Sequence, residues 1–128
     1  MREILFRGKH KADGKWCEGN LHIDKQGVAI ITPDDTPLGC YGQVDPDTVG
    51  QFTGLMDKHG KKIFEGDIVR VEVAKIDWVA VCKFYGGAFG LVWNFCAAER
   101  WQAFTGICNA EYEIIGNVHD NPELTKGE

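Results

Sequence analysis

The sequence predicts a mainly β protein of the α+β class with few short helices. Glycine is abundant, with 16 residues of 128 against 4 prolines, as expected for short strands joined by tight turns. About eight to ten short segments rich in β-branched and aromatic residues follow one another, with turn signals roughly every 8–12 residues. No segment shows a helical apolar period over three turns.

The N-terminal third is expected to form a three-stranded antiparallel meander. The strands are expected over residues 3–9, 16–23 and 28–32. Asp13-Gly14 marks the first turn, because this pair supplies the positive φ angles of a tight hairpin, and residues 24–27 mark the second. Gly19 is a candidate bulge in the middle strand.

A loop and a capped turn are expected next. Two prolines interrupt residues 33–39, where the adjacent carboxylates of Asp34 and Asp35 could bind a cation but more often form a solvated loop tip. Asp45 is expected to cap one helical turn that begins at Pro46, where a missing N–H costs nothing.

The second half predicts a further series of strands, over residues 51–57, 68–73, 78–84, 91–95 and 112–118. Residues 68–73 alternate apolar and charged side chains, and the Gly66-Asp67 step before them is common in small SH3-like barrels. Residues 97–104 fit either one helical turn or an edge strand. A bulge is expected at Gly116 and a single capped turn over residues 120–124.

These elements suggest two parts. We expect residues 1–62 to form the N-terminal meander and a linking motif, packed on an SH3-like small C-terminal β-barrel over residues 63–128. The two parts are expected to fold as one compact unit.

Several chemistries are disfavoured by composition. The chain contains no serine, which excludes a serine nucleophile, and no Gly-Lys pair is followed by serine or threonine, which excludes a phosphate-binding loop. The five cysteines lack the close spacing of zinc ligands and suggest free thiols in a reducing compartment. A zinc site from His10, Cys17 and His22, or a Cys–His nucleophile pair, is easily constructed from so many residues and is not preferred. We therefore predict no catalytic residue, no metal site and no cofactor.

Charge argues against a phosphate backbone as the main partner. The net charge is −5; residues 1–62 carry nine basic and nine acidic side chains, whereas residues 63–128 carry five and ten. Only the first fifteen residues lean basic. No apolar run is long enough to span a membrane, and charges within the first apolar stretch argue against a signal peptide. A cytoplasmic location without a membrane partner is expected.

Three stretches resemble the YopX family of phage and prophage proteins: residues 2–7 followed by Trp16 and Gly19, residues 44–69, and residues 112–124. The resemblance implies a small protein encoded by a phage or prophage and located in the bacterial host cytosol. It carries over no catalytic residue, because no function is established for the family. The middle stretch itself suggests architecture: its glycines suit bends, and Thr48, Gln51 and Thr53 can satisfy backbone groups at turns.

The preferred function is that of a non-enzymatic binding module for a host or phage protein. A homo-oligomer formed through a strand edge is an additional partner hypothesis. The alternatives are a small barrel that binds nucleic acid, which the charge disfavours, and an enzyme acting on a small molecule. The candidate interaction surface combines basic and aromatic side chains: Arg2, Arg7, Lys9, Lys15, Trp16, Trp93 and Trp101.

Overall fold

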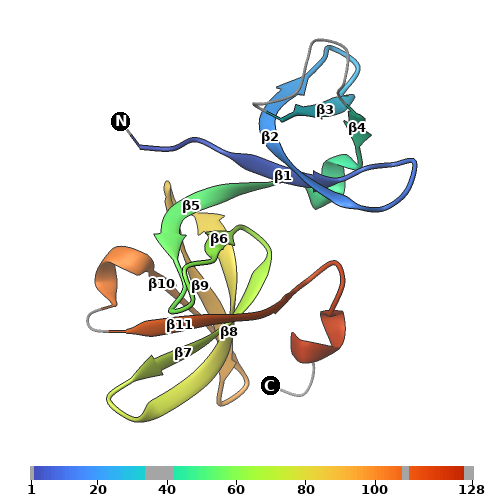
Figure 1. The fold of residues 1–128 in the computed structure, drawn as a ribbon. Coiled ribbons are helices and arrows are strands. Elements are labelled where there is room, and N and C mark those ends of the chain that lie inside the picture. Colours follow the sequence, from blue (N-terminus) through green and yellow to red (C-terminus); the bar gives the residue numbers. More distant parts are fainter. Residues whose placement is uncertain (1, 34–41, 108–109, 126–128) are drawn as a thin grey trace. The chain divides into compact units, whose positions relative to one another are not determined.

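Strands dominate the protein, as the sequence predicts. The computed structural model describes residues 2–33, 42–107 and 110–125. This described part contains eleven strands in two antiparallel sheets and three short 3₁₀ helices (Figure 1). The chain divides into two compact units, unit 1 over Met1–Gly54 and unit 2 over Leu55–Glu128.

Unit 1 is built around the predicted meander. Its elements are β1 (Phe6–Lys9), β2 (Trp16–Ile23), β3 (Ala29–Thr32), β4 (Gly42–Val44), η1 (Pro46–Thr48) and β5 (Gly50–Met56), which crosses into unit 2. The strands follow the order β4-β3-β2-β1-β5, so the meander β1–β2–β3 is confirmed. Its small core centres on Ala29, Ile31 and Val44.

Gly19 is not a bulge. The pairing of β1 with β2 runs without a shift from Lys9 opposite Trp16 to Phe6 opposite Gly19. A side chain at Gly19 would instead collide with the backbone carbonyl of Thr32 on the neighbouring strand β3. Glycine is needed here because the two backbones approach closely.

The capped turn at residues 45–48 forms as predicted. Asp45 is the N-cap of η1, and its Oδ1 accepts a hydrogen bond from the backbone N–H of Asp47 at 3.0 Å. The Thr48 hydroxyl donates to the Asp45 carbonyl at 2.6 Å and accepts from the Lys9 backbone N–H at 2.9 Å. This turn is thereby tied to strand β1.

Unit 2 contains an open five-stranded sheet. Its elements are β6 (Lys62–Phe64), β7 (Asp67–Val73), β8 (Ile76–Tyr85), β9 (Ala88–Phe95), β10 (Ala98–Ala103), η2 (Phe104–Gly106), β11 (Glu111–Asn117) and η3 (Pro122–Thr125). The sheet order is β10-β9-β8-β7-β11, with β10 and β11 at its two edges (Figure 1). The expected closed barrel is wrong, because within the described residues no ladder joins these edge strands.

Residues 97–104 illustrate a choice that the sequence left open. Residues 98–103 form the edge strand β10, and the chain then turns into η2 at Phe104. The predicted irregularity in the last strand is present as a register shift between Ile114 and Gly116. The predicted turn after this strand appears as η3.

Three successive hairpins of unit 2 have loops of only two residues. The loops are Ala74-Lys75, Gly86-Gly87 and Cys96-Ala97, and all six residues have positive φ angles. This is the backbone of the turn type that matches the twist of the flanking strands. The four residues other than glycine adopt a conformation that costs about 1 kcal/mol or more each.

The core of unit 2 lies on one face of the five-stranded sheet, here called the inner face; the opposite face is the outer face. The buried core residues are Ile63, Val69, Val71, Ala80, Cys82, Leu91 and Phe104. The chain enters β7 through Gly66, whose φ is +90°, and the buried Asp67 carboxylate accepts the Phe64 backbone N–H at 2.8 Å. This confirms the predicted sharp reversal at the Gly66-Asp67 step.

No helix in the described part of the chain is long and apolar enough to cross a membrane.

The strained turn between β9 and β10 provides a test of this architecture. Replacing Cys96 with Asn and Ala97 with Gly should raise the free energy of unfolding by about 1 kcal/mol, because these residues tolerate positive φ. Urea unfolding followed by circular dichroism measures the change. Gly87→Ala is the opposite control and should lower stability by about 1 kcal/mol. A less stable C96N/A97G variant would contradict this account of the turn.

Candidate functional site

The basic hairpin places two cations against one tryptophan. Lys9 on β1 lies opposite Trp16 on β2, and Arg7 leaves the same face of β1 because it is two residues away. The Arg7 guanidinium carbon is 4.7 Å from the centroid of the Trp16 ring, and the Lys9 Nζ is 5.4 Å from it. Both distances allow cation–π attraction. Arg7, Lys9 and Trp16 are here called the cation cluster.

The other two predicted residues of unit 1 lie outside its strands. Arg2 and Lys15 are both exposed. Lys15 directly precedes Trp16, and its backbone N–H donates to Asp13 Oδ1 at 2.9 Å. A nucleic-acid base that stacks on Trp16 has to compete with the two cations of the cluster for the ring.

The two predicted tryptophans of unit 2 occupy opposite faces of the sheet. Trp101 pairs with Val92, and Arg100 pairs with Trp93. Paired residues of antiparallel strands share a face, whereas neighbours along a strand alternate. Trp93 packs against the core on the inner face, so Trp101 belongs to the outer face. The two tryptophans do not share one surface.

Trp101 belongs to a small hollow that we call the aromatic groove. It has a volume of about 260 Å³ and is lined by Lys83, Phe84, Tyr85, Val92, Glu99, Arg100 and Trp101. The Tyr85 and Trp101 rings meet edge to face, with centroids 5.3 Å apart. The Tyr85 side chain remains 68% exposed and the Phe84 side chain 53% exposed. The groove therefore presents aromatic area to solvent beside two cations.

Gly90 makes room for the Trp101 ring. A Cβ atom at Gly90 would lie 2.8 Å from Cη2 of Trp101 and would collide with the Gln102 carbonyl. The missing side chain lets the indole lie against strand β9, which fixes its position at the edge of the sheet.

Trp93 lines a second cavity, which we call the apolar hollow. Its volume is about 440 Å³, and its lining residues are Val73, Ala74, Ile76, Trp78, Trp93, Gln102, Gly106 and Ile107. The Trp78 and Trp93 rings stand at 46° to each other with centroids 5.7 Å apart. The Trp78 Nε1 is buried, and no hydrogen-bond partner is found for it in the described part of the chain.

The sequence prediction missed Trp78, Lys83 and Tyr85 as site residues. Lys83 and Tyr85 stand two residues apart just before the Gly86-Gly87 turn, which places them on one face near a strand end. That alternation was a usable signal. The pairing of Val92 with Trp101, which brings Trp101 to Tyr85, depends on register and had no signal in the sequence.

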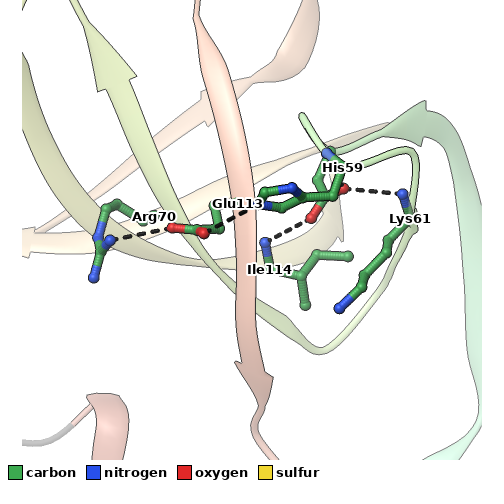
Figure 2. A network of polar contacts seen from close by, with 6 residues as sticks. His59, Lys61, Arg70, Glu113 and Ile114 are labelled. Carbon is green, nitrogen blue, oxygen red and sulfur yellow. Dashed lines mark hydrogen bonds and ion pairs between the residues drawn. The ribbon is translucent and has the colours of Figure 1, made fainter.

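A buried carboxylate ties the turn at residues 57–61 to strand β11 (Figure 2). Asp57 Oδ1 accepts the backbone N–H groups of His59 and Lys61 at 2.9 Å each, and Oδ2 accepts that of Ile114 at 3.1 Å. Burial alone would raise the pKa of this carboxyl, but the three N–H donors lower it below its ordinary value. A carboxylate held in this way is a structural anchor rather than an acid or base.

Glu113 on β11 joins two side chains at the surface. Its Oε2 lies 3.2 Å from His59 Nε2, and its Oε1 accepts from Arg70 Nη1 at 3.1 Å (Figure 2). The hydrogen bond from His59, with the charge of Lys58, lowers the pKa of Glu113. Because the group is exposed, this network adds little to stability.

The cysteines give little support to nucleophilic chemistry. Cys17, Cys82 and Cys96 are free thiols. Burial, followed by the charge of Asp13, raises the pKa of Cys17, which keeps its thiol protonated and weakly nucleophilic. Among the described residues no three His, Cys, Asp or Glu side chains form a metal site. The proposed cation pair Asp34 and Asp35 lies outside the described residues, as do Cys40 and Cys108.

The Asp57 anchor predicts a specific loss of stability. In Asp57→Asn an amide NH₂ replaces one of the two carboxylate oxygens, so at least one backbone N–H loses its acceptor. We expect the free energy of unfolding to fall by about 2 kcal/mol. Glu113→Gln is the exposed control and should change it by no more than about 0.5 kcal/mol. Urea unfolding of both variants measures the difference.

The same anchor predicts a pH dependence. A lowered pKa in the folded protein means that the ionised carboxylate stabilises it above the unfolded pKa of about 3.9 and is lost as the pH falls through the folded pKa. The stability difference between wild type and Asp57→Asn should therefore be constant above about pH 5 and shrink below about pH 4. A difference that grows on acidification would contradict this assignment.

Comparisons with known proteins agree with this architecture. Among solved structures, protein EF1440 from Enterococcus faecalis is similar, with a TM-score of 0.60 and 23% identity over 98% of this chain and 100% of that chain. This likeness shows a shared fold. No match is found among curated proteins. The sequence model of the YopX protein family matches residues 5–126, which confirms the resemblance noted from the sequence. Since this match spans nearly the whole chain, the protein belongs to the YopX family.

Proposed function

We propose that the protein is a phage- or prophage-encoded accessory protein that acts in the bacterial cytoplasm by binding a host or phage protein. The observation that carries the proposal is the aromatic groove, with its exposed Phe84 and Tyr85 rings beside Lys83 and Arg100. Tyrosine, tryptophan and arginine are the residues that most often dominate binding energy at protein interfaces. Grouped aromatic rings at a surface are typical of such interfaces.

The groove also has the rigidity that a binding surface needs. Lys83, Tyr85, Val92 and Trp101 project from three paired strands of one sheet face. Trp101 is held by its contact with Tyr85 and by the space at Gly90. Side chains positioned in this way lose little further freedom on binding, which favours affinity.

The proposed role is non-enzymatic. Its support is the use of the buried carboxylates: Asp57 and Asp67 both accept backbone N–H groups where the chain turns. These are architectural contacts, and they occupy lone pairs that acid–base catalysis would need.

The likeness of unit 2 to an SH3-like barrel is part of this proposal. It is supported by the meander β7–β8–β9–β10, followed by η2 and by β11, which returns to pair with β7. In this view unit 2 is an open form of that architecture whose edge strand β10 borders the binding surface.

Protein capture with a groove variant tests the main proposal. Tyr85→Ala removes an exposed ring and should leave the fold intact while weakening the partner at least tenfold, as expected for an interface hot spot. The matched control is Ile23→Ala, which removes a 57% exposed side chain from unit 1. Tagged wild type, Y85A and I23A are compared by mass spectrometry after capture from induced host cells.

The expected result is a protein retained by wild type and I23A and lost from Y85A. If that partner is a second copy of this chain, light scattering of the purified protein will show an oligomer that Y85A dissociates. Equal recovery of every captured protein by Y85A and wild type would reject the groove as the binding surface.

The cation cluster favours nucleic acid as a second candidate function. Binding to single-stranded DNA should weaken steeply with salt, and Arg7→Gln should reduce the slope of log affinity against log salt concentration by about 0.7, the share of one phosphate contact. Fluorescence anisotropy of a labelled oligonucleotide measures both quantities. Lys25→Gln, an exposed charge in the β2–β3 turn, is the control and should leave the slope unchanged. The absence of binding at low salt would remove this candidate.

A further inference from the structure

The apolar hollow has the size and lining of a small-molecule site. Its volume of about 440 Å³ falls within the range of about 300–1,000 Å³ usual for such sites. Two tryptophans, Trp78 from β8 and Trp93 from β9, contribute to its wall with rings at 46°. An aromatic ligand can meet such rings edge to face or offset, the arrangements that aromatic pairs prefer.

One wall residue has an unused hydrogen-bond donor. The Trp78 Nε1 is buried, and in the described residues nothing accepts its hydrogen. Buried donors are nearly always paired, because leaving one unpaired is unfavourable. A ligand with an acceptor atom that reaches this N–H would satisfy it, whereas a purely apolar ligand would not.

The lining also specifies the charge of the ligand. None of its eight described residues is charged, and Gln102 contributes the single polar side chain among them. The Gln102 Nε2 lies 3.4 Å from the Ala103 carbonyl oxygen, longer than a good hydrogen bond, so this amide can turn toward a ligand at little cost. A charged ligand would lose hydration without gaining a partner.

We propose that the apolar hollow binds a neutral aromatic compound that carries a carbonyl oxygen. The ring packs against Trp78 and Trp93, and the carbonyl oxygen accepts the hydrogen of Trp78 Nε1. The hollow draws on inner-face residues of the sheet, whereas the aromatic groove draws on the outer face. This site is therefore independent of the proposed protein interface.

The four tryptophans provide an internal control for the test. Trp78 and Trp93 line the hollow, Trp101 lies on the outer face, and Trp16 belongs to unit 1. Each indole N–H gives one signal in an ¹H–¹⁵N spectrum of the labelled full-length protein, assigned with single Trp→Phe variants. Benzamide is the probe, and toluene and cyclohexanecarboxamide are comparators that lack the carbonyl oxygen and the aromatic ring, respectively.

Benzamide should shift the Trp78 and Trp93 indole signals in a saturable manner and leave those of Trp16 and Trp101 in place. The carbonyl should make benzamide bind about fivefold more tightly than toluene, as one neutral hydrogen bond allows. The Trp78 signal should move downfield with benzamide, because its hydrogen becomes bonded, and not with toluene.

Two variants separate the hydrogen bond from simple packing. Trp78→Phe keeps an aromatic wall without the donor and should abolish the preference for benzamide over toluene. Trp93→Phe keeps the Trp78 donor and should weaken both probes while preserving that preference. Unchanged dispersion of the remaining indole signals shows that each variant is folded, and Trp101→Phe serves as the variant outside the hollow.

The proposal is overturned if benzamide moves all four indole signals equally or none of them. It is also overturned if folded Trp78→Phe retains the full preference for benzamide, or if cyclohexanecarboxamide binds as tightly as benzamide. None of these results depends on whether a protein partner uses the aromatic groove.

Discussion

Three turns of two residues each determine which side chains of unit 2 share a face. Each turn leaves no slack between its strands, so the register from β7 to β10 follows directly from the positions of Ala74-Lys75, Gly86-Gly87 and Cys96-Ala97. A shift of one residue would move every side chain of a strand to the other face. Trp78 and Trp93 lie together beside the core, and Tyr85 and Trp101 lie together on the outer face, as a consequence of this register.

The stretch over residues 44–69, which first suggested the family, serves mainly to shape the backbone. Asp45 caps η1, Thr48 links that turn to Lys9, Asp57 binds three N–H groups, and Asp67 closes the reversal before β7. Each of these side chains satisfies backbone groups that turns leave unpaired. This use explains how a stretch rich in carboxylates and glycines can define a family without marking an active site.

The candidate surface predicted from the sequence is distributed over several places. Arg7, Lys9 and Trp16 come together in unit 1, because paired strands bring residues nine and sixteen face to face. Trp93 and Trp101 are separated by the sheet itself. The aromatic residues of unit 2 consequently serve two sites of different character, an open groove flanked by cations and an uncharged hollow with one unpaired donor.

The sequence by itself determined the mainly β class, the N-terminal meander, the Asp45 cap and the reversal at Gly66-Asp67, because alternation and turn chemistry are local properties. It did not determine that β10 and β11 remain separate edges, that Gly19 accommodates the Thr32 carbonyl, or that Tyr85 meets Trp101. Those outcomes depend on how strands distant in the chain pair and curve. Residue spacing along the chain does not encode such distances, so only the tertiary structure decided where the two candidate sites lie.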